Sequence, residues 1–415
     1  MRRLLPLLVL AALASCSHRD RANPFDPSNP DTHGGPSGLI ALAGDGRVDL
    51  RWDPVAGTSL VGYRLYRRTA AETTFRVISA LLPPATARYA DVGLLNGLDH
   101  FYRLAFVFDP DGERGQAAED TATPGPARPW VTDTDLGQIF RIAPDGRRIA
   151  FVKSGLSAPN AVAIDRSSGA VWVSDAFAGN VVVLNPWTGA TVTIPGLVSP
   201  AALAVEPAGH SAWVCDERGG TVYQFDPAGS PVGNAIAPID TPIGVALDPA
   251  DRSAWIAERG AGRVRHYSES HVLLGSTTVN KPSRVAVDSL TRNPWVTSFE
   301  SGQVFELDPS GNLVRTIPGL RGPIGVTVDA RRGRIWVADA LASQLVVLDR
   351  FGTVLFRVGG ISEVRDVSVD PATGEAWAVA TGTGEVVRVS LGGTVLRRLG
   401  GFRQPVGISV DPGTP

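Results

Sequence analysis

Acidic side chains recur at one fixed distance from a repeated tryptophan in the last two-thirds of this 415-residue chain. The seven tryptophans are Trp130, Trp172, Trp213, Trp255, Trp295, Trp336 and Trp377, and the positions three residues later are Asp133, Asp175, Asp216, Glu258, Ser298, Asp339 and Ala380. A ring of carboxylates could bind a cation or a basic ligand, whereas acids that accept backbone N–H groups in their own turns would serve the fold. Repetition favours the structural role, because a structural need recurs in every repeat and a ligand site does not.

Polar residues that break a repeated pattern are better candidates for a ligand site. Six repeats carry a segment of the form Pro-x-x-apolar-x-apolar-acid, and a degenerate copy begins at Val364; the third residue is usually Ala or Gly. That residue is Arg284 in one repeat and Asp366 in the degenerate copy. Departures from a local rule cluster at functional sites. With the acids and their neighbours, the candidate ligand-binding residues are Asn160, Asp175, Asp216, Glu258, Arg259, Arg284, Arg365 and Asp366.

The spacing of the tryptophans predicts the elements that position these residues. The intervals are 40 to 42 residues, and each unit holds short runs rich in Val and Ile, bounded by Gly, Pro and Asp. Four strands per unit of about 40 residues indicate the blades of a β-propeller. The repeat begins at Trp130 and ends with the segment 405–411, so this last segment is expected to complete the first of seven blades and close the ring. The tryptophans should pack between neighbouring blades.

The predicted ring brings the candidates to one face. Neighbouring strands of a blade run in opposite directions, so the starts of the inner strands and the ends of the tryptophan strands share a face. Arg284, Arg365 and Asp366 are expected near the axis, where they form either a ligand cluster or a paired set of charges in the channel. The pairing is favoured, because buried charges usually have partners.

Residues 323–329 (PIGVTVD), 335–339 (IWVAD) and 344–349 (QLVVLD) resemble NHL-type repeats and the related propeller of streptogramin lyases, over residues 129–411. Those lyases use His and Glu side chains with a divalent metal on one propeller face. Here His210 and His271 are expected on the opposite face and His266 lies within a strand, which argues against a lyase. An all-carboxylate metal site remains open. No cofactor is predicted, and no sequence feature specifically supports a divalent cation.

The first residues predict export and a lipid anchor. Residues 1–16 contain two arginines, a short apolar run and Leu13-Ala14-Ser15-Cys16, which resembles the lipobox of bacterial lipoproteins. The resemblance implies lipidation of Cys16 and a place in the bacterial cell envelope, with outer-membrane anchoring expected. An ordinary cleaved signal is the alternative. Residues 17–35, rich in Asn, Pro, Asp, Ser and Gly, predict a flexible stalk.

Residues 36–124 form a separate predicted unit. Seven short strand-like runs with turn residues between them indicate a β-sandwich. Trp52, Gly62-Tyr63-Arg64-Leu65-Tyr66 and Phe101-Tyr102-Arg103-Leu104 resemble a fibronectin type III domain, although His100 stands where that family has its corner tyrosine. Residues 125–128 are the predicted linker, and residues 129–415 the propeller. The predicted class is therefore all-β, a fibronectin type III sandwich followed by a seven-bladed propeller of four-stranded blades.

The charge of the chain limits the kinds of partner that can be expected. The formal net charge is −2, and no basic run or stripe is present, so nucleic acid is not an expected partner. The sequence favours an exported, lipid-anchored surface protein whose propeller binds a protein, peptide or glycan without catalysis. A metal-dependent lyase or hydrolase resembling streptogramin lyase is the alternative, and a structural envelope protein is a second one.

Overall fold

The computed structural model describes residues 23–30, 32–55, 57, 59–96, 98–108, 112–125, 128–206 and 211–411. Cys16 and its predicted signal lie outside these residues, as do His210 and parts of the predicted stalk and linker. One compact unit takes the chain up to residue 40, 50–89 and 100–121, and the other takes 41–49, 90–99 and the chain from residue 122 onward. No helix in the described residues is long and apolar enough to cross a membrane.

Seven strands before residue 123 form two antiparallel sheets. One sheet has the order β1 (Ile40–Gly44), β2 (Arg47–Arg51), β5 (Arg88–Val92), and the other β4 (Arg76–Val77), β3 (Leu60–Thr69), β6 (His100–Phe108), β7 (Gly112–Ala122). Trp52 follows β2, and its ring centroid lies 5.6 Å from that of Tyr63 in β3. Both side chains are buried, so aromatic rings supply much of this core.

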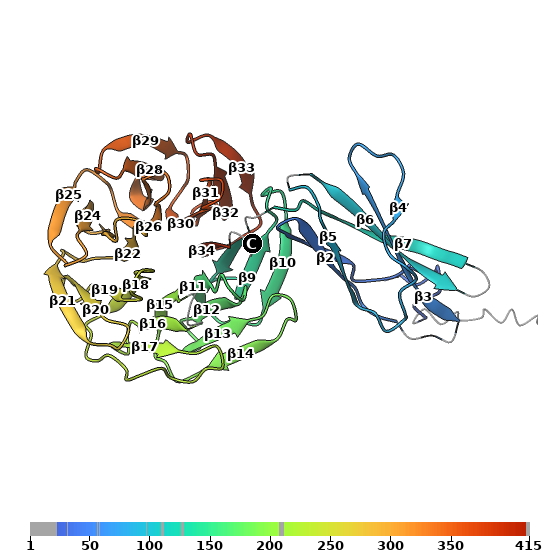
Figure 1. The fold of residues 1–415 in the computed structure, drawn as a ribbon, viewed down its shortest axis with the longest axis horizontal. Helices are drawn as coiled ribbons and strands as arrows, with labels where there is room; N and C mark the ends of the chain where they lie inside the picture. The colour runs from blue at the N-terminus through green and yellow to red at the C-terminus, as the bar shows by residue number, and fades with distance from the viewer. Residues whose placement is uncertain are drawn as a thin grey trace, which may run out of the picture. The chain divides into compact units, whose positions relative to one another are not determined.

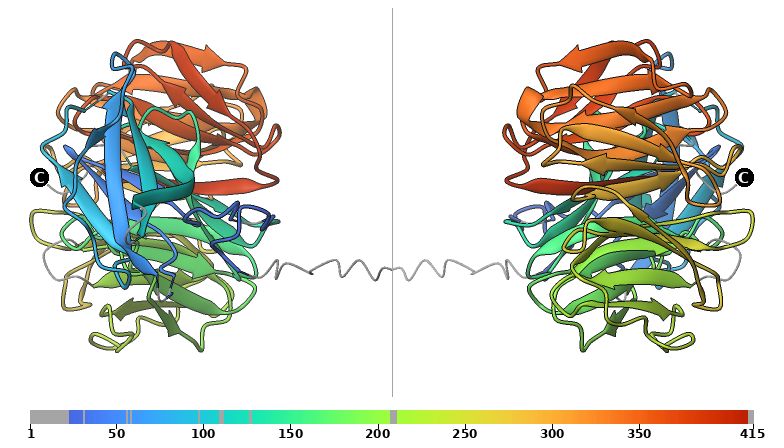
Figure 2. Two further views of the ribbon diagram at one scale, coloured as in Figure 1. Left: turned by 90° about the vertical axis from the view of Figure 1, so that its right-hand side faces the viewer. Right: turned by 90° about the vertical axis from the view of Figure 1, so that its left-hand side faces the viewer.

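Seven further sheets surround one axis and form the predicted propeller (Figure 1). Seen from the side, their strands run between the two faces of the ring (Figure 2). Each blade is given from its inner strand outward: the first is β34 (Pro405–Asp411), β8 (Arg128–Asp133), β9 (Gln138–Ile142), β10 (Ile149–Ser154); the second is β11 (Pro159–Ile164), β12 (Val171–Asp175), β13 (Asn180–Leu184), β14 (Thr191–Ile194); and the third is β15 (Pro200–Val205), β16 (Ala212–Asp216), β17 (Thr221–Phe225). The fourth blade is β18 (Pro242–Leu247), β19 (Ala254–Glu258), β20 (Arg263–Tyr267), β21 (Leu273–Thr278), and the fifth is β22 (Arg284–Val287), β23 (Pro294–Ser298), β24 (Gln303–Leu307), β25 (Leu313–Ile317). The sixth blade is β26 (Pro323–Asp329), β27 (Arg334–Asp339), β28 (Gln344–Asp349), β29 (Val354–Gly359), and the seventh is β30 (Val364–Val369), β31 (Ala376–Ala380), β32 (Glu385–Val389), β33 (Val395–Leu399).

The predicted closure of the ring is confirmed. Strand β34 pairs antiparallel with β8, with Ile408 opposite Val131 and Asp411 opposite Arg128. The prediction of four strands in every blade is wrong for the third blade, whose sheet is β15-β16-β17. Only two isolated bridges, Val222 to Ile236 and Phe225 to Pro231, replace its outer strand. The two bridges are three residues apart on β17 (225 − 222) but five apart on the outer run (236 − 231), so this run carries two extra residues and does not pair along its length.

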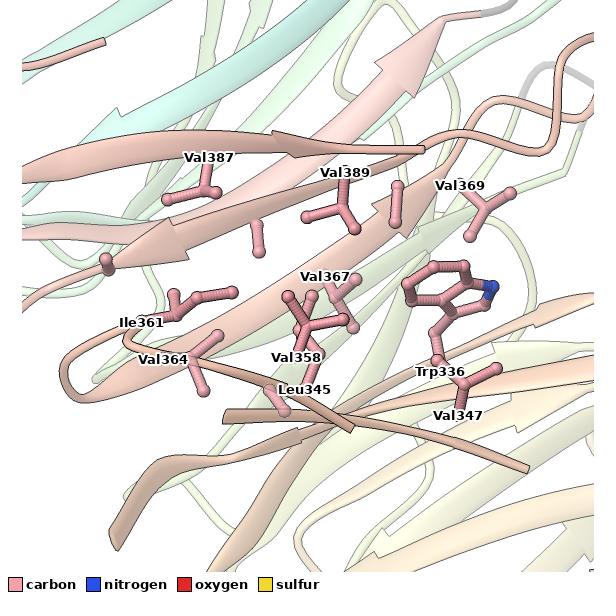
Figure 3. Packing of buried hydrophobic residues seen from close by; sticks show 14 residues of the cluster. Trp336, Leu345, Val347, Val358, Ile361, Val364, Val367, Val369, Val387 and Val389 are labelled. Carbon is pink, nitrogen blue, oxygen red and sulfur yellow. The ribbon is translucent and has the colours of Figure 1, made fainter. Parts of the chain in front are cut away.

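The repeated tryptophans fill the space between blades, as predicted. Each is at most 1% exposed. Trp336 of β27 packs among Val364, Val367 and Val369 of the next blade (Figure 3). Trp377 reaches Ile408 in the same way, so the last blade packs against the first. This packing recurs around the ring and buries the large rings where the blades diverge.

Small residues at the third position of the inner strands have a steric cause. A Cβ at Gly407 would lie 2.4 Å from the Asn160 backbone oxygen, and one at Gly325 would lie 2.7 Å from the Asp366 Cα. Contacts this short do not occur for real Cβ atoms, so neighbouring inner strands approach too closely for a side chain there.

Candidate ligand-binding site

The repeated acids hold the chain that enters each blade. Pro159 pairs with Asp175 and Pro200 with Asp216, so inner-strand starts and tryptophan-strand ends share one face, here called the proline face. The Asp175 carboxylate accepts the N–H groups of Ser157 and Ala158, both at 2.7 Å. Asp216 accepts from the two residues before Pro200, at 2.9 and 2.7 Å.

These carboxylates are buried rather than presented to a ligand. Asp175 is 2% exposed and Asp216 1%. Asp133 makes the same bonds to the N–H groups of Arg403 and Gln404, at 2.7 and 3.1 Å, and thereby fixes the closing strand. Charge-assisted bonds to backbone N–H groups are strong in a buried setting. We therefore assign Asp175 and Asp216 to the support of the loops on the proline face.

Glu258 occupies the same position in the fourth blade and is also fully engaged. Its carboxylate accepts the Asp240 N–H at 2.7 Å and forms ion pairs with Arg263 and with Arg265, the latter at 2.8 Å. Burial alone would raise its pKa, but the hydrogen bonds from Arg263 and Asp240 and the charge of Arg265 hold the pKa of Glu258 below its ordinary value. This acid is 1% exposed, so it too supports the fold.

A cavity of about 300 Å³ opens on the proline face at the propeller axis. It is lined by the second residues of six of the repeated Pro-x-x segments (counting the degenerate copy at Val364), by Arg284 at the third position of one of them, and by residues of three loops that follow tryptophan strands. The lining residues are Asn160, Ala201, Ile243, Ser283, Ile324 and Arg365 from the second positions, Arg284 from the third, and Glu217, Arg259 and Phe299 from the loops. Non-repeated residues thus meet in one concave place, which we call the axial pocket.

Arg284 and Asp366 link neighbouring inner strands. Arg284 donates to the backbone oxygen of Ile243 in β18. The Asp366 carboxylate accepts the Val367 N–H at 2.9 Å and the Ile408 N–H of β34 at 3.1 Å. No contact within 4.0 Å joins Arg284 to Asp366 in the described part of the chain, so the predicted ion pair is replaced by separate bonds to backbone. Burial raises the pKa of Asp366 to about 6, against the Arg284 charge and the two N–H donors.

Folding stability should fall as the pH rises through the range in which Asp366 titrates. Its pKa rises from 3.8 in the unfolded chain to about 6 in the folded chain, so the folded chain holds this proton more tightly. The resulting stabilisation is complete below the unfolded pKa and is lost as the pH passes the folded pKa, by at most about 3 kcal/mol. Urea unfolding of the protein and of Asp366→Asn should show the variant gaining relative stability between about pH 4.5 and about pH 7.5. A stability difference that does not change with pH would contradict this assignment.

The structure thus divides the predicted site residues into two groups. It brings Asn160, Arg259, Arg284 and Arg365 together in the axial pocket. It places Asp175, Asp216 and Glu258 in buried supporting bonds, and Asp366 against the backbone of β34. Glu217, Ser283 and Phe299 also line the pocket and were not among the candidates. For Glu217 and Phe299, the signal was the residue four positions after each tryptophan, which differs in character from blade to blade.

The histidines and carboxylates do not form the metal site that the resemblance to lyases implies. His266 stacks on Trp255 with ring centroids 3.8 Å apart and bonds Ser253 at 2.8 Å, and burial lowers its pKa. His271 bonds Gln224 at 2.8 Å. Across the described ranges, no three His, Cys, Asp or Glu side chains are placed to hold a metal ion. The described histidines and carboxylates therefore do not fit a divalent cation.

Comparison with known proteins supports the fold and leaves the activity open. No protein-family model matches the chain. Amylopullulanases from Thermoanaerobacterium saccharolyticum and Thermoanaerobacterium thermosulfurigenes are 28% and 27% identical over 96 residues, 23% of this chain. The chain spans only 7% and 5% of the lengths of these relatives.

Solved structures of similar shape are β-propellers. A functionally unknown protein from Desulfotomaculum acetoxidans matches with a TM-score of 0.60 at 16% identity, over 69% of this chain and 99% of that one. A streptogramin B lyase matches with a TM-score of 0.54 at 14% identity, over 60% and 86% of the two chains. A catalytically inactive virginiamycin B lyase from Staphylococcus aureus, solved with quinupristin, gives 0.54 at 12%, over 69% and 97%. The chain therefore has a propeller fold like that of the streptogramin B lyases.

Proposed function

We propose that this chain is an exported, lipid-anchored protein of the bacterial envelope whose propeller binds a peptide, a protein segment or a glycan in the axial pocket, without catalysis. The observation that carries the proposal is the convergence of non-repeated polar side chains on one cavity, while the repeated acids around it are consumed by the fold. Concave sites with a few convergent polar groups among apolar ones are typical of ligand binding. Ile243, Ile324 and Phe299 supply the apolar part here.

The N-terminal part of the proposal rests on sequence. The lipobox-like segment ending at Cys16 would anchor the chain, and the two sheets before residue 123, whose sequence resembles a fibronectin type III domain, would act as a spacer. Cys16→Ala should shift the protein from the membrane fraction to the soluble fraction after cell lysis. A variant that still sediments with membranes would show that the anchor assignment is wrong.

A thermal-shift screen of the detergent-solubilised full chain tests the binding function. The compounds are divalent cations, glycans and peptides, because a ligand of the folded state raises the melting temperature by mass action. We expect a peptide or glycan to raise it, and Arg365→Gln to remove the shift. Arg331→Gln is the matched control, since this exposed arginine lies in the turn after β26, away from the pocket. A shift with a cation alone would favour the metal-dependent alternative, and a shift that survives Arg365→Gln would place binding elsewhere.

A further inference from the structure

Two charged side chains of opposite sign in the axial pocket have no partner. Arg365 is exposed and Glu217 is half-buried, and neither side chain forms a hydrogen bond or an ion pair with another residue in the part of the chain that the structure describes. The other two arginines have partners of different kinds: Arg259 pairs with the Glu300 carboxylate at 2.8 Å, whereas Arg284 donates to the neutral backbone oxygen of Ile243. Among its described residues, the pocket therefore has one cation and one anion whose side chains have no partner, and a second cation, Arg284, that is hydrogen-bonded to backbone but not paired with a carboxylate.

The two free charges stand on opposite sides of the axis. The inner strands follow one another around the ring in the order β34, β11, β15, β18, β22, β26, β30, and then β34 again (Figure 1). Arg365 is in β30, and Glu217 follows β16 of the blade whose inner strand is β15. Three steps separate these blades, which is the largest separation possible in a ring of seven. Both residues line the same pocket, and no ion pair joins them in the part of the chain that the structure describes.

The surface between these charges holds the two engaged arginines, Arg259 and Arg284, and otherwise neutral residues. Asn160 and Ser283 are polar, while Ile243, Ile324 and Phe299 are apolar. A ligand with one charge would cover the other free charge without a partner, and an unpaired desolvated charge is costly. A ligand with both charges would satisfy Arg365 with a carboxylate, whose geometry suits the guanidinium fork, and Glu217 with an ammonium group. A cavity of about 300 Å³ limits such a ligand to a small molecule.

We propose that the axial pocket binds a small zwitterion, an amino acid or short peptide with free ends, whose carboxylate contacts Arg365 and whose ammonium group contacts Glu217. The inference rests on the proposed binding function and names its ligand class. The apolar side chains beside the path between the two charges favour an aliphatic side chain on the ligand. Amino acids and peptides share this chemistry, and their different lengths distinguish them in the experiment below.

Titration calorimetry of the detergent-solubilised full chain tests the inference. The probes are leucine, alanyl-leucine and alanyl-alanyl-leucine, each free, N-acetylated or C-amidated. At least one free compound should bind, and blocking either end should weaken its binding about tenfold or more, because each block removes one charged contact. In Arg365→Gln, the C-amidated compound should bind as tightly as the free compound, while the N-acetylated compound should still bind more weakly than the free one. Glu217→Gln should do the reverse, and Arg331→Gln should change neither.

Three results would overturn the inference. The first is the absence of binding by any free compound, the second is equal binding of free and blocked forms, and the third is the same loss of discrimination in both pocket variants. If a glycan or a doubly blocked peptide gives an Arg365-dependent thermal shift instead, the proposed binding function stands and only the zwitterion is wrong. If no compound class shifts the melting temperature, both proposals fail.

Discussion

Truncation after Gln404 should abolish the cooperative unfolding transition of the propeller or lower its melting temperature by about 10 °C or more. The lost strand β34 is the inner strand of the first blade and pairs with β8. Burial of Ile408 and Val410 alone contributes roughly 3 to 6 kcal/mol. The truncation also removes Asp411, whose carboxylate pairs with Arg128 at 3.1 Å. Both side chains are at most 5% exposed, so the truncation leaves Arg128 as a buried charge without its partner, which is strongly destabilising.

Point variants on the same strand separate closure from a general effect of truncation. Ile408→Ala should cost about 2 to 4 kcal/mol, because its side chain is 5% exposed and packs with Trp377 of the last blade. Val406→Ala, at a half-buried position of β34, should cost much less. Calorimetric melting of the three variants provides the measurement. An unchanged melting temperature after truncation would show that the ring does not depend on its closing strand.

Gly325→Ala should destabilise the propeller by about 1 to 3 kcal/mol, although the change adds one methyl group. The new Cβ would lie 2.7 Å from the Asp366 Cα and 2.9 Å from the Arg365 backbone oxygen. Both atoms belong to β30, so the strand itself must move rather than a flexible side chain. That movement would displace Arg365, and we expect the variant to lose ligand binding as well as stability.

The same blade offers a matched control for this substitution. Gly359 ends the outer strand β29, and a Cβ there would have no atom within 4 Å. Gly359→Ala should therefore leave stability and binding nearly unchanged, and equilibrium denaturation of the two variants compares them directly. Equal stabilities of Gly325→Ala and Gly359→Ala would mean that the inner strands are not closely packed around the axis.

The propeller could be predicted from the sequence because its blades repeat large residues (tryptophan) and small residues (alanine or glycine) at fixed positions. The tryptophan spacing gives the number of blades, and the segment 405–411 after the last tryptophan predicts closure. The third blade lacks the predicted fourth strand for a local reason. Its outer run carries two extra residues between its two bridges to β17, a detail that the spacing of the tryptophans does not report.

The pocket was predicted only in part, because a sequence does not show which polar atoms other groups consume. Departures from the repeat identified Asn160, Arg284 and Arg365. Asp175 and Asp216 lie at the same face, but the backbone N–H groups of the two residues before the inner strand of the same blade occupy their oxygens. Glu217 is one position from such an acid and remains free among the described residues, a distinction that appears only when the loops are placed in space.

The most direct test of a binding pocket at the axis is hydrogen–deuterium exchange of the full chain with and without a compound that raises its melting temperature. We expect slower exchange of amides in the loops that carry Glu217, Arg259 and Phe299 and at the start of β30. Exchange in outer strands such as β21 and β25 should not change. Protection confined to the outer strands, with none around the axial pocket, would contradict a binding pocket at the axis.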